Sequence, residues 1–458
     1  MCARPCSRSA IYGATSTSRS VHGRRCSCPR THVRARRRSH SLGGPMARLI
    51  RSPAGPVVVG IALMGLGIAL RLPVFDYAGP RHQIAFNQYP FDQSWAAYSD
   101  IASLFFRDGQ WRHPIPYFDY RLEYPVVTGA FVYAMSAFAG GVTAYFVASA
   151  AVLAGLGAAT IALVRRVPGS NVWLLAASPA IVLYSAINWD LLALLPTVAA
   201  LILYVRGRDG WAGALLAVAV SAKLFPILLL PFALLVAVME RRVRAAAAGA
   251  ATFALVTVAI NLPVALQERA GSGLVVRKGW AWFYKFNLKR PPEISIYHYI
   301  RPSSLGTAGI NRVSGIALAV ALIALLVIAA RRFGRERSRA VLLPAFATAL
   351  LVFFFVNKVY SPQYSLWVMA LLALLGAPLW LAAAFAAIDL FTTYVGFHQF
   401  AVHGQPAHHN YITGVLNPAG AVREVALLAV LAWFAVRLLG ASGPRTAASR
   451  PRAGPASP

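Results

Sequence analysis

The sequence has few charged residues for its length, and acidic residues are the scarcest of all. Only 13% of its 458 residues are Asp, Glu, Lys or Arg, about half the usual share of a soluble domain, and only 14 are acidic. The four cysteines all lie in the first 28 residues, without the spacing of a zinc site. These shortages exclude a soluble enzyme and a secreted disulfide scaffold.

In place of charge the sequence has hydrophobic residues, which make up 58% of the chain. Runs of about 20 apolar residues recur from residue 57 to the final quarter, and each is long enough to cross a ~30 Å hydrocarbon core. A disordered protein is thereby excluded. The pattern predicts an all-α, polytopic integral membrane protein with about 10–12 transmembrane helices and a long first exterior loop over residues 73–124.

Three parts are expected along the chain. Residues 1–50 are rich in Arg and Cys and predict a disordered cytoplasmic tail, although Met46 also opens a plausible shorter protein. Residues 51–440 are expected to form the membrane-embedded domain. Residues 441–458, rich in Pro, Ala, Ser and Arg, predict a second disordered cytoplasmic tail.

The net charge of +30 is distributed as in a membrane protein rather than a nucleic-acid binder. Ten arginines precede Met46 with no acid among them, and most other cations flank apolar segments, as the positive-inside rule requires. No cluster of cations marks a folded basic face, so nucleic acid is not an expected partner. The rule predicts a multi-pass protein of the cell membrane with both termini in the cytoplasm.

Charge also chooses between two topologies. In the favoured one, residues 172–205 and 211–239 are hairpins with outward tips at residues 188–190 and at a break near residues 223–226. One of the two apolar segments between residues 126 and 164 then fails to cross fully. The competing topology treats every apolar stretch as one crossing and puts residues 188–190 inside. The first is preferred because it leaves no arginine pair on the outer side.

The first exterior loop concentrates the rare acids. It holds six of the fourteen, and aromatic residues alternate with them. Carboxylates beside aromatic rings suit a sugar-binding, acid–base site, because sugar rings stack on aromatics while their hydroxyl groups need acceptors. The alternatives are ordinary surface acids and aromatic anchoring at the lipid–water interface. The six acids are Asp76, Asp92, Asp100, Asp108, Asp119 and Glu123.

A second exterior loop, residues 268–312, is unusually basic. It carries eight cations against two acids, and the cations lie among aromatic residues. Because positive charge is normally scarce on the outer face, a lipid phosphate bound there would explain it. Non-specific attachment to anionic headgroups is the alternative. The candidate phosphate-binding residues are Arg277, Lys278, Lys285 and Arg290.

Four ionisable residues interrupt or border apolar segments and are therefore candidate functional residues. They are Lys223, Asp190, Lys358 and Asp389. For Lys223 a buried partner or a lipid phosphate is expected. Lys358 can instead extend its amine to the interface, and Asp389 can simply pair with a neighbouring helix.

Histidines gather near the end of the chain without the spacing of a metal site. They do not form a helical His-x-x-x-His pair, so solvated loop histidines are expected rather than metal ligands. No glycine-rich phosphate loop or Ser-His-Asp pattern is evident, and no cofactor is expected. The histidines are His398, His403, His408 and His409.

Several motifs together resemble actinobacterial members of glycosyltransferase family 87. They are Tyr-Ser-Asp-Ile at residues 98–101, Glu-Tyr-Pro at 123–125, Asn-Trp-Asp at 188–190, Lys-Leu-Phe-Pro at 223–226 and Ser-Pro-Gln-Tyr at 361–364. The resemblance extends from about residue 57 to residue 439. It implies a membrane fold of the GT-C class and a polyprenyl-phosphate sugar donor, commonly mannose. It also implies inverting transfer to a glycolipid or glycan outside the membrane.

The resemblance also implies roles for individual residues. Asp100, in the first-loop motif, becomes the catalytic base, and cations that stabilise the departing lipid phosphate replace a general acid. Asp119 and Glu123 are second-choice carboxylates for the acceptor. Asn-Trp-Asp stands where many members carry a Gly-Gln-type pair, and Gln363 where some carry His, which leaves the donor and acceptor open. The expected substrate-binding residues are Asp119, Glu123, Tyr124, Asn188, Asp190, Lys223, Arg277, Lys278, Lys285, Arg290, Lys358, Gln363 and Tyr364.

Two other functions compete with the enzyme hypothesis. A transporter or flippase for lipid-linked saccharides would place functional charges through the membrane midplane and contain an internal repeat. No repeat is evident, and the acids gather in one exterior loop instead. A non-catalytic membrane assembly factor is the third possibility.

Overall fold

The computed structural model describes residues 52–77, 95–138, 140–269, 273–300 and 305–440. Its contacts divide the chain into residues 1–48 and residues 49–458, and every described residue belongs to the second unit. The four cysteines, Asp92 and both expected tails lie outside the described residues.

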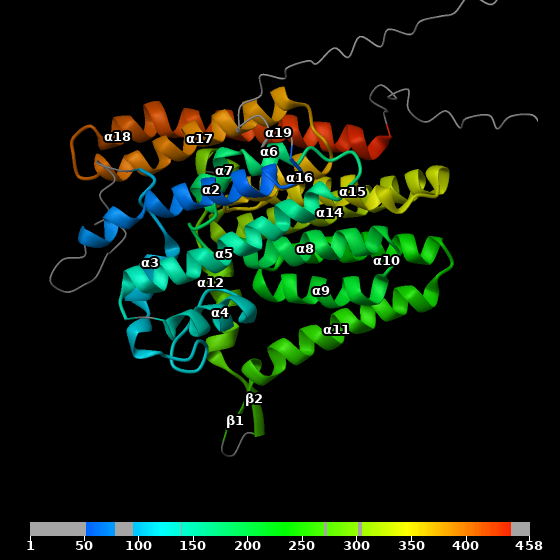
Figure 1. Cartoon of the computed structure of the whole chain (residues 1–458), viewed down its shortest axis with the longest axis horizontal. Helices are drawn as coiled ribbons and strands as arrows, with labels where there is room; N and C mark the ends of the chain where they lie inside the picture. The colour runs from blue at the N-terminus through cyan, green and yellow to red at the C-terminus, as the bar shows by residue number, and fades with distance from the viewer. Residues whose placement is uncertain (1–51, 78–94, 139, 270–272, 301–304, 441–458) are drawn as a thin grey trace, which may run out of the picture. The chain divides into compact units, whose positions relative to one another are not determined.

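The described chain is predominantly helical with a single short pair of strands, which confirms the predicted all-α membrane fold (Figure 1). Within the described residues, six stretches are long and apolar enough to cross a membrane, and six further apolar helices are shorter. The long stretches contain α5 (Val142–Arg165), α11 (Val243–Ala265), α14 (Gly306–Glu336), α15 (Leu342–Val356), α17 (Leu379–Ala401) and α19 (Asn417–Leu439). The shorter ones contain α2 (Gly55–Ala69), α4 (Val126–Ser136), α8 (Asp190–Val205), α9 (Asp209–Ala222), α10 (Leu229–Met239) and α16 (Tyr364–Leu374).

The core of the bundle lies around α16. All eleven residues of this helix are buried, and Trp367 is among the largest side chains that are completely enclosed. Around it the helices run side by side, with α9 between α8 and α11. A Cβ atom on Gly213 of α9 would lie 2.2 Å from the carbonyl oxygen of Gly249 on α11, so only glycine permits this close approach.

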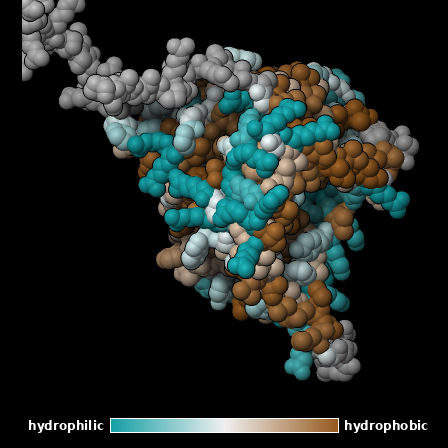
Figure 2. Space-filling view, turned by 90° about the vertical axis from the view of Figure 1, so that its right-hand side faces the viewer, coloured by the Kyte–Doolittle hydropathy of each residue, from teal (hydrophilic) through white to brown (hydrophobic). Residues whose placement is uncertain are grey.

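One end of the bundle collects the turns that carry arginine. Arg339 forms ion pairs with Asp209 (2.7 Å) and Glu240 (2.5 Å), which joins the turn after α8 to the turn after α10. Arg165, at the end of α5, donates to the carbonyl of Pro53, just before α2. We call this end, on the right of Figure 1, the basic end, and Figure 2 shows hydrophilic side chains gathered over it.

The two predicted hairpins are present, and in each of them the apolar stretch is divided into shorter helices. α9 ends at Ala222, Lys223 takes an extended conformation, and the 3-10 turn η4 (Phe225–Leu228) leads into α10, as the predicted break requires. The apolar stretch before α8 is divided into α6 (Trp173–Ala176) and α7 (Pro179–Tyr184), because Ser178 caps a new helix start by accepting a hydrogen bond from the Ala180 amide.

The segment between residues 126 and 164 also follows the favoured topology. α4 has 11 residues and spans only about 16 Å, too short for a ~30 Å hydrocarbon core, whereas α5 has 24 residues. The short α4 fits the favoured topology, in which one of these two segments does not cross fully.

The opposite end of the bundle carries most of the short elements. They are the 3-10 turns η1 (Leu72–Tyr77) and η3 (Gln110–Arg112), α3 (Asp100–Arg107), the antiparallel pair β1 (Leu266–Arg269) and β2 (Gly273–Val276), α12 (Lys278–Lys289), α13 (Ile296–Ile300), α18 (His408–Tyr411) and the π-helical turn η6 (Ile412–Leu416). The remaining 3-10 turn, η5 (Arg339–Val341), precedes α15 at the basic end.

Candidate active site

Asp100 stands at the first position of α3, and its neighbour Ser99 fixes it there. Ser99 is extended, and its hydroxyl accepts a hydrogen bond from the Ile101 amide (3.2 Å), which caps the helix. The Ser99 hydroxyl also donates to the carbonyl of Ala186 (2.8 Å), and the Asp100 amide donates to that of Ile187 (2.8 Å). The segment that precedes α3 is thus anchored to the turn between α7 and α8. A carboxylate at a helix start is favoured by the helix dipole.

Three side chains donate hydrogen bonds to the Asp100 carboxylate. The Tyr98 hydroxyl donates to Oδ1, while the Tyr124 hydroxyl (3.1 Å) and the Asn188 amide (3.5 Å) reach Oδ2. Burial raises the pKa of Asp100 above its ordinary value, and the bonds from Tyr98 and Tyr124 partly oppose that rise. A carboxylate with a raised pKa is a stronger base, held here in one orientation.

An ion pair between a buried carboxylate and a partly exposed lysine lies next to Asn188. The Lys223 amine is 2.5 Å from Asp190 Oδ2, and the Trp367 indole donates to Asp190 Oδ1 (2.7 Å). Asn188 connects this pair to Asp100, because its side-chain oxygen accepts from the Asp190 amide (3.1 Å) while its side-chain nitrogen contacts Asp100. Four of the predicted residues, Tyr124, Asn188, Asp190 and Lys223, thus share one polar network with the candidate base.

Two further cations, Arg290 and Lys358, lie near the same network. Arg290 forms an ion pair with Glu293 (2.5 Å) and lies close enough to Tyr124 and Tyr364 to interact electrostatically with both. Lys358 is buried, and its amine donates to the Leu288 carbonyl (3.0 Å). Burial, followed by repulsion from Arg290, lowers the pKa of Lys358. Arg290 therefore places positive charge beside Tyr124, and Lys358 lies close to Arg290.

Backbone pairing holds the segments of Arg290 and Lys358 together. The Glu293 amide donates to the Lys358 carbonyl and the Tyr360 amide to the Glu293 carbonyl, each at 3.0 Å. The Ser295 hydroxyl adds a bond to the Lys358 carbonyl (2.7 Å). No sequence pattern indicated this pairing, because the two segments are far apart in the chain.

Other expected residues have contacts elsewhere. The Asp119 carboxylate accepts a hydrogen bond from the Ile115 amide (2.7 Å) within its own turn. Arg277 donates to the carbonyls of Val264 and Leu266 and stacks on Phe118, with 3.9 Å between the guanidinium carbon and the ring centre.

Three more of the expected residues also lie apart from the hydrogen bonds around Asp100. Lys278 and Lys285 are exposed on α12, and Gln363 is buried at the start of α16. In the part of the chain that the structure describes, none of the three forms a hydrogen bond with the network, whereas Glu123 is near it.

Glu123 belongs to an acid–arginine cluster beside the site. Arg107 pairs with Glu123 (2.5 Å) and with Asp108 (2.7 Å). Glu123 is close enough to Asp100 to contribute to the raised pKa of Asp100. Sequence reasoning did not single out Arg107, although it directly precedes Asp108 in the chain, which was a local signal for an ion pair.

Sequence reasoning also missed Trp367 and the partners of Asp389. Trp367 lies in an apolar run, and the only signal was that Asp190, at the start of an apolar helix, needed buried partners. Asp389 accepts from Ser365 (2.5 Å) and Tyr184 (2.7 Å), so it does pair with neighbouring helices. Ser365 is bonded in turn to the Tyr360 hydroxyl (2.9 Å).

The histidines form no cluster that suggests a metal site. Within the described ranges, no group of three or more His, Cys, Asp and Glu side chains converges. His398 stacks on Tyr394 with 5.7 Å between ring centres, and His403 meets His408 edge-on at 4.8 Å.

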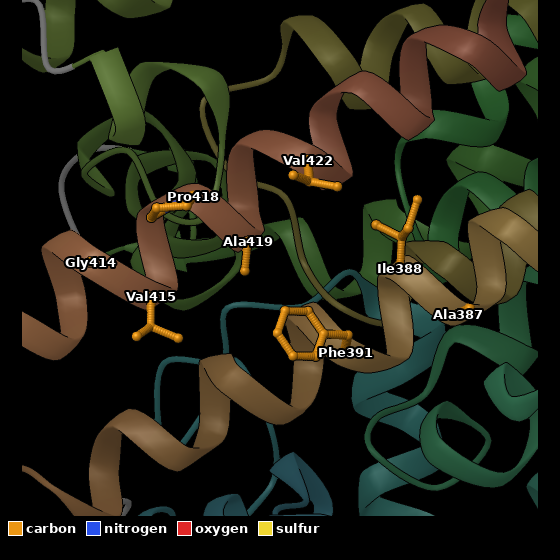
Figure 3. Close-up of a pocket in the computed structure, with 8 residues that line it drawn as sticks. All are labelled: Ala387, Ile388, Phe391, Gly414, Val415, Pro418, Ala419 and Val422. Atoms are coloured by element: carbon orange, nitrogen blue, oxygen red, sulfur yellow. The ribbon is translucent and has the colours of Figure 1, made fainter.

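An apolar groove lies on the surface between α17, η6 and α19 (Figure 3). It has a volume of about 500 Å³, and Phe391, Val415 and Val422 are among the side chains around it. Phe391 precedes Tyr394 by almost one turn of α17. Further along α17, Phe397 packs on Tyr98 with 5.5 Å between ring centres. One helix therefore borders both the groove and the surroundings of Asp100.

A comparison with protein families decides the class of this protein. The model of glycosyltransferase family 87 matches residues 123–362, more than half of the chain. The chain belongs to glycosyltransferase family 87. As a member of this family it is a multi-pass membrane glycosyltransferase. No curated protein and no solved structure matches the chain.

The family 87 match covers most of the site but not all of it. It includes Tyr124, Asn188, Lys223, Arg290 and Lys358. Asp100 precedes the matched residues, and its place in the site rests on the hydrogen bonds described above.

Proposed function

We propose that this family 87 glycosyltransferase moves a sugar, mannose in the first instance, from a polyprenyl-phosphate donor to a glycolipid or glycan acceptor. Transfer takes place at the outer face of the cell membrane and inverts the anomeric centre. The observation that carries the proposal is the Asp100 carboxylate, held by Tyr98, Tyr124 and Asn188 with cations on the neighbouring side.

The proposed reaction is a single displacement. The acceptor hydroxyl oxygen attacks the anomeric carbon, and Asp100 takes the hydroxyl proton as the new carbon–oxygen bond forms. The bond between the sugar and the phosphate oxygen breaks on the opposite face, and its electron pair leaves with the lipid phosphate. Because attack and departure occur on opposite faces, the configuration inverts.

The cations are proposed to stabilise the leaving phosphate. A phosphate needs no proton to leave, but its growing negative charge needs positive charge nearby. Arg290 interacts with Tyr124, which itself contacts Asp100, so positive charge borders the candidate base. Lys358 and Lys223 lie on either side of this arrangement, Lys358 beside Arg290 and Lys223 beside Tyr364 at 5.7 Å from its ring centre.

The apolar groove of Figure 3 supports a lipid-linked donor. α17 borders the groove at Phe391 and contacts Tyr98 beside Asp100 through Phe397. An isoprenoid chain in the groove would therefore lead toward the reacting centre along one helix.

The orientation follows from the basic end. The positive-inside rule favours the basic end in the cytoplasm, which puts Asp100 and the short elements outside. Pro53 and Arg437 are both held at the basic end, the latter through a hydrogen bond from Arg332 to its carbonyl, so both termini are proposed to be cytoplasmic.

A flippase for lipid-linked saccharides is the second candidate. The observation in its favour is the Asp190–Lys223 pair, since transporters also carry charges within their helices. Against it, both oxygens of Asp190 are occupied by fixed partners, Lys223 and Trp367.

The deciding experiment supplies polyprenyl-phosphate [14C]mannose and a crude glycolipid and glycan extract to the purified protein in nanodiscs. Wild type is expected to transfer label. The transfer rate of Asp100→Asn is expected to be lower by about 100-fold or more, because general-base catalysis contributes on that order. Asp119→Asn is the matched control, since this acid is used within its own turn, and it should retain transfer.

The other outcomes are equally informative. Transfer that survives in a folded Asp100→Asn protein would move the base to Glu123. If label from lipid-linked mannose and from other lipid-linked hexoses and pentoses stays with the donor, the flippase proposal takes precedence.

A further inference from the structure

A second groove lies at the basic end, away from the Asp100 network, between α9 and α11. Its volume is about 660 Å³, and its lining includes Arg208, Trp211, Ala214, Ala248 and Leu255. Trp211 is 74% exposed and Leu255 69% exposed, although both are large apolar side chains. A groove with such walls in a membrane protein calls for an apolar occupant.

The floor of the groove is largely apolar, although its lining includes Asp209, whose Oδ2 has no hydrogen-bond partner among the described residues and lies 3.7 Å from Arg242. The Thr252 hydroxyl donates to the carbonyl of Gly210 (2.8 Å), so the helices are joined there and the hydroxyl is not free for a ligand. Ala214 and Ala248 project only methyl groups from the facing helices. An acyl chain can lie against this surface without leaving a polar group unsatisfied.

The mouth of the groove carries excess positive charge. Asp209 and Glu240, the carboxylates of these turns, are both paired with Arg339, and Arg242 adds contacts of 3.7 Å to each. In the part of the chain that the structure describes, Arg208, Arg241 and Arg244 have no carboxylate within ion-pair distance.

The turns that carry these cations are held side by side. The Arg242 guanidinium donates to the Gly207 carbonyl (3.1 Å), which joins the turn before α9 to the turn before α11. Arg208 lines the groove itself, and Arg244 lies about one helical turn before Ala248 on α11. Figure 2 shows hydrophilic side chains on this face directly beside hydrophobic ones.

We propose that this groove is a binding site for an anionic phospholipid. Arg208, with Arg241 and Arg244, holds the phosphate of the headgroup, while one acyl chain lies between α9 and α11 over Ala214 and Ala248. Trp211 lies at headgroup depth, where tryptophan is enriched in membrane proteins. The site is independent of sugar transfer, since it shares no residue with the Asp100 network.

The test uses the full-length protein in detergent with added phosphatidylglycerol or phosphatidylcholine, and native mass spectrometry to measure bound lipid. Wild type is expected to bind phosphatidylglycerol at least about fivefold more tightly, since each cation at a membrane surface contributes on that order. Arg208→Gln should remove most of this preference. Ala248→Phe, which fills the groove at an exposed position, should weaken binding of phosphatidylglycerol while leaving all charges in place.

The matched control is Arg335→Gln, which removes one exposed arginine from the end of α14 at the same end of the bundle. It should bind phosphatidylglycerol as wild type does. The proposal is overturned if wild type has no preference between the two lipids. It is also overturned if Arg335→Gln loses as much of the preference for phosphatidylglycerol as Arg208→Gln does, or if folded Ala248→Phe binds phosphatidylglycerol as tightly as wild type. Thermal unfolding of each variant without added lipid identifies any that fail to fold.

Discussion

At the scale of single residues, Asn188 explains why the candidate site is one unit rather than two. Its side chain contacts the Asp100 carboxylate with its nitrogen and the Asp190 amide with its oxygen. An aspartate there would place a third negative charge between two others, and a leucine would satisfy neither group. The sequence indicated that Asn188 and Asp190 matter, but not that one amide side chain uses both of its ends.

Tyr124→Phe should change the pH dependence of transfer. The Tyr124 hydroxyl donates to the charged form of Asp100 and so lowers its pKa, which means that its removal raises the pKa further. Because the base must be deprotonated, the acidic limb of the kcat/KM profile should move to higher pH, with the alkaline side less affected. Tyr133→Phe, at an exposed ring on α4, should leave the profile unchanged. A Tyr124→Phe limb that stays in place or moves to lower pH would contradict the assignment of Asp100 as base.

At the scale of helices, the break between α9 and α10 depends on an ion pair. Lys223 is extended, and its amine reaches Asp190 at the start of α8, so the pair joins two neighbouring hairpins at their tips. The break itself was predictable, because a lysine followed by Pro226 interrupts an apolar run. The partner was not, since no local pattern connects residues 33 positions apart. The division of residues 172–187 into α6 and α7 was likewise not predicted, because the serine cap lies inside an apolar stretch.

Single changes to this ion pair should cost more stability than a paired change. Lys223→Met leaves Asp190 charged and buried and is expected to lower the free energy of unfolding by about 3–5 kcal/mol. The double variant Asp190→Asn, Lys223→Met removes both charges and should recover much of that loss. Thermal unfolding followed by tryptophan fluorescence measures the difference.

The same double variant separates two roles of Lys223. If the amine also stabilises the leaving phosphate, the double variant recovers stability while sugar transfer stays low. Recovery of both stability and transfer would reduce Lys223 to a structural residue. A double variant less stable than either single one would contradict the ion-pair argument itself.

At the scale of the whole molecule, the arginine-bearing turns after α5, α8, α10 and α14 lie at one end, and the candidate site lies toward the other. The helical fold and this grouping of charge could be predicted, because bilayer thickness and the positive-inside rule act on composition alone. The meeting of Asp100, Asn188 and Arg290 could not, since it depends on how distant segments pack. The exposed aromatic and basic residues of α12 indicate a membrane surface. Their pattern does not predict which of the cations lie near the candidate site.

Labelling from outside the cell tests the orientation. In a variant with its four cysteines replaced by serine, Lys285→Cys on α12 should react with a membrane-impermeant maleimide in intact cells. Arg335→Cys, at the end of α14, should react only after the membrane is opened. The reverse pattern would put Asp100 in the cytoplasm and exclude transfer at the outer face.

The backbone pairing of Glu293 with Val359 affects where the sequence can gain or lose residues during evolution. It pins together segments about sixty residues apart, Ser295 and Lys358 being 63 positions from each other. The segment that contains α13, α14 and α15, called the excursion below, therefore begins and ends at the same place in the structure. Insertions or deletions within that excursion change its length without changing the spacing between Arg290 and Lys358. The largely exposed helix α14 can thus change its length with the thickness of the bilayer while the two cations keep their places.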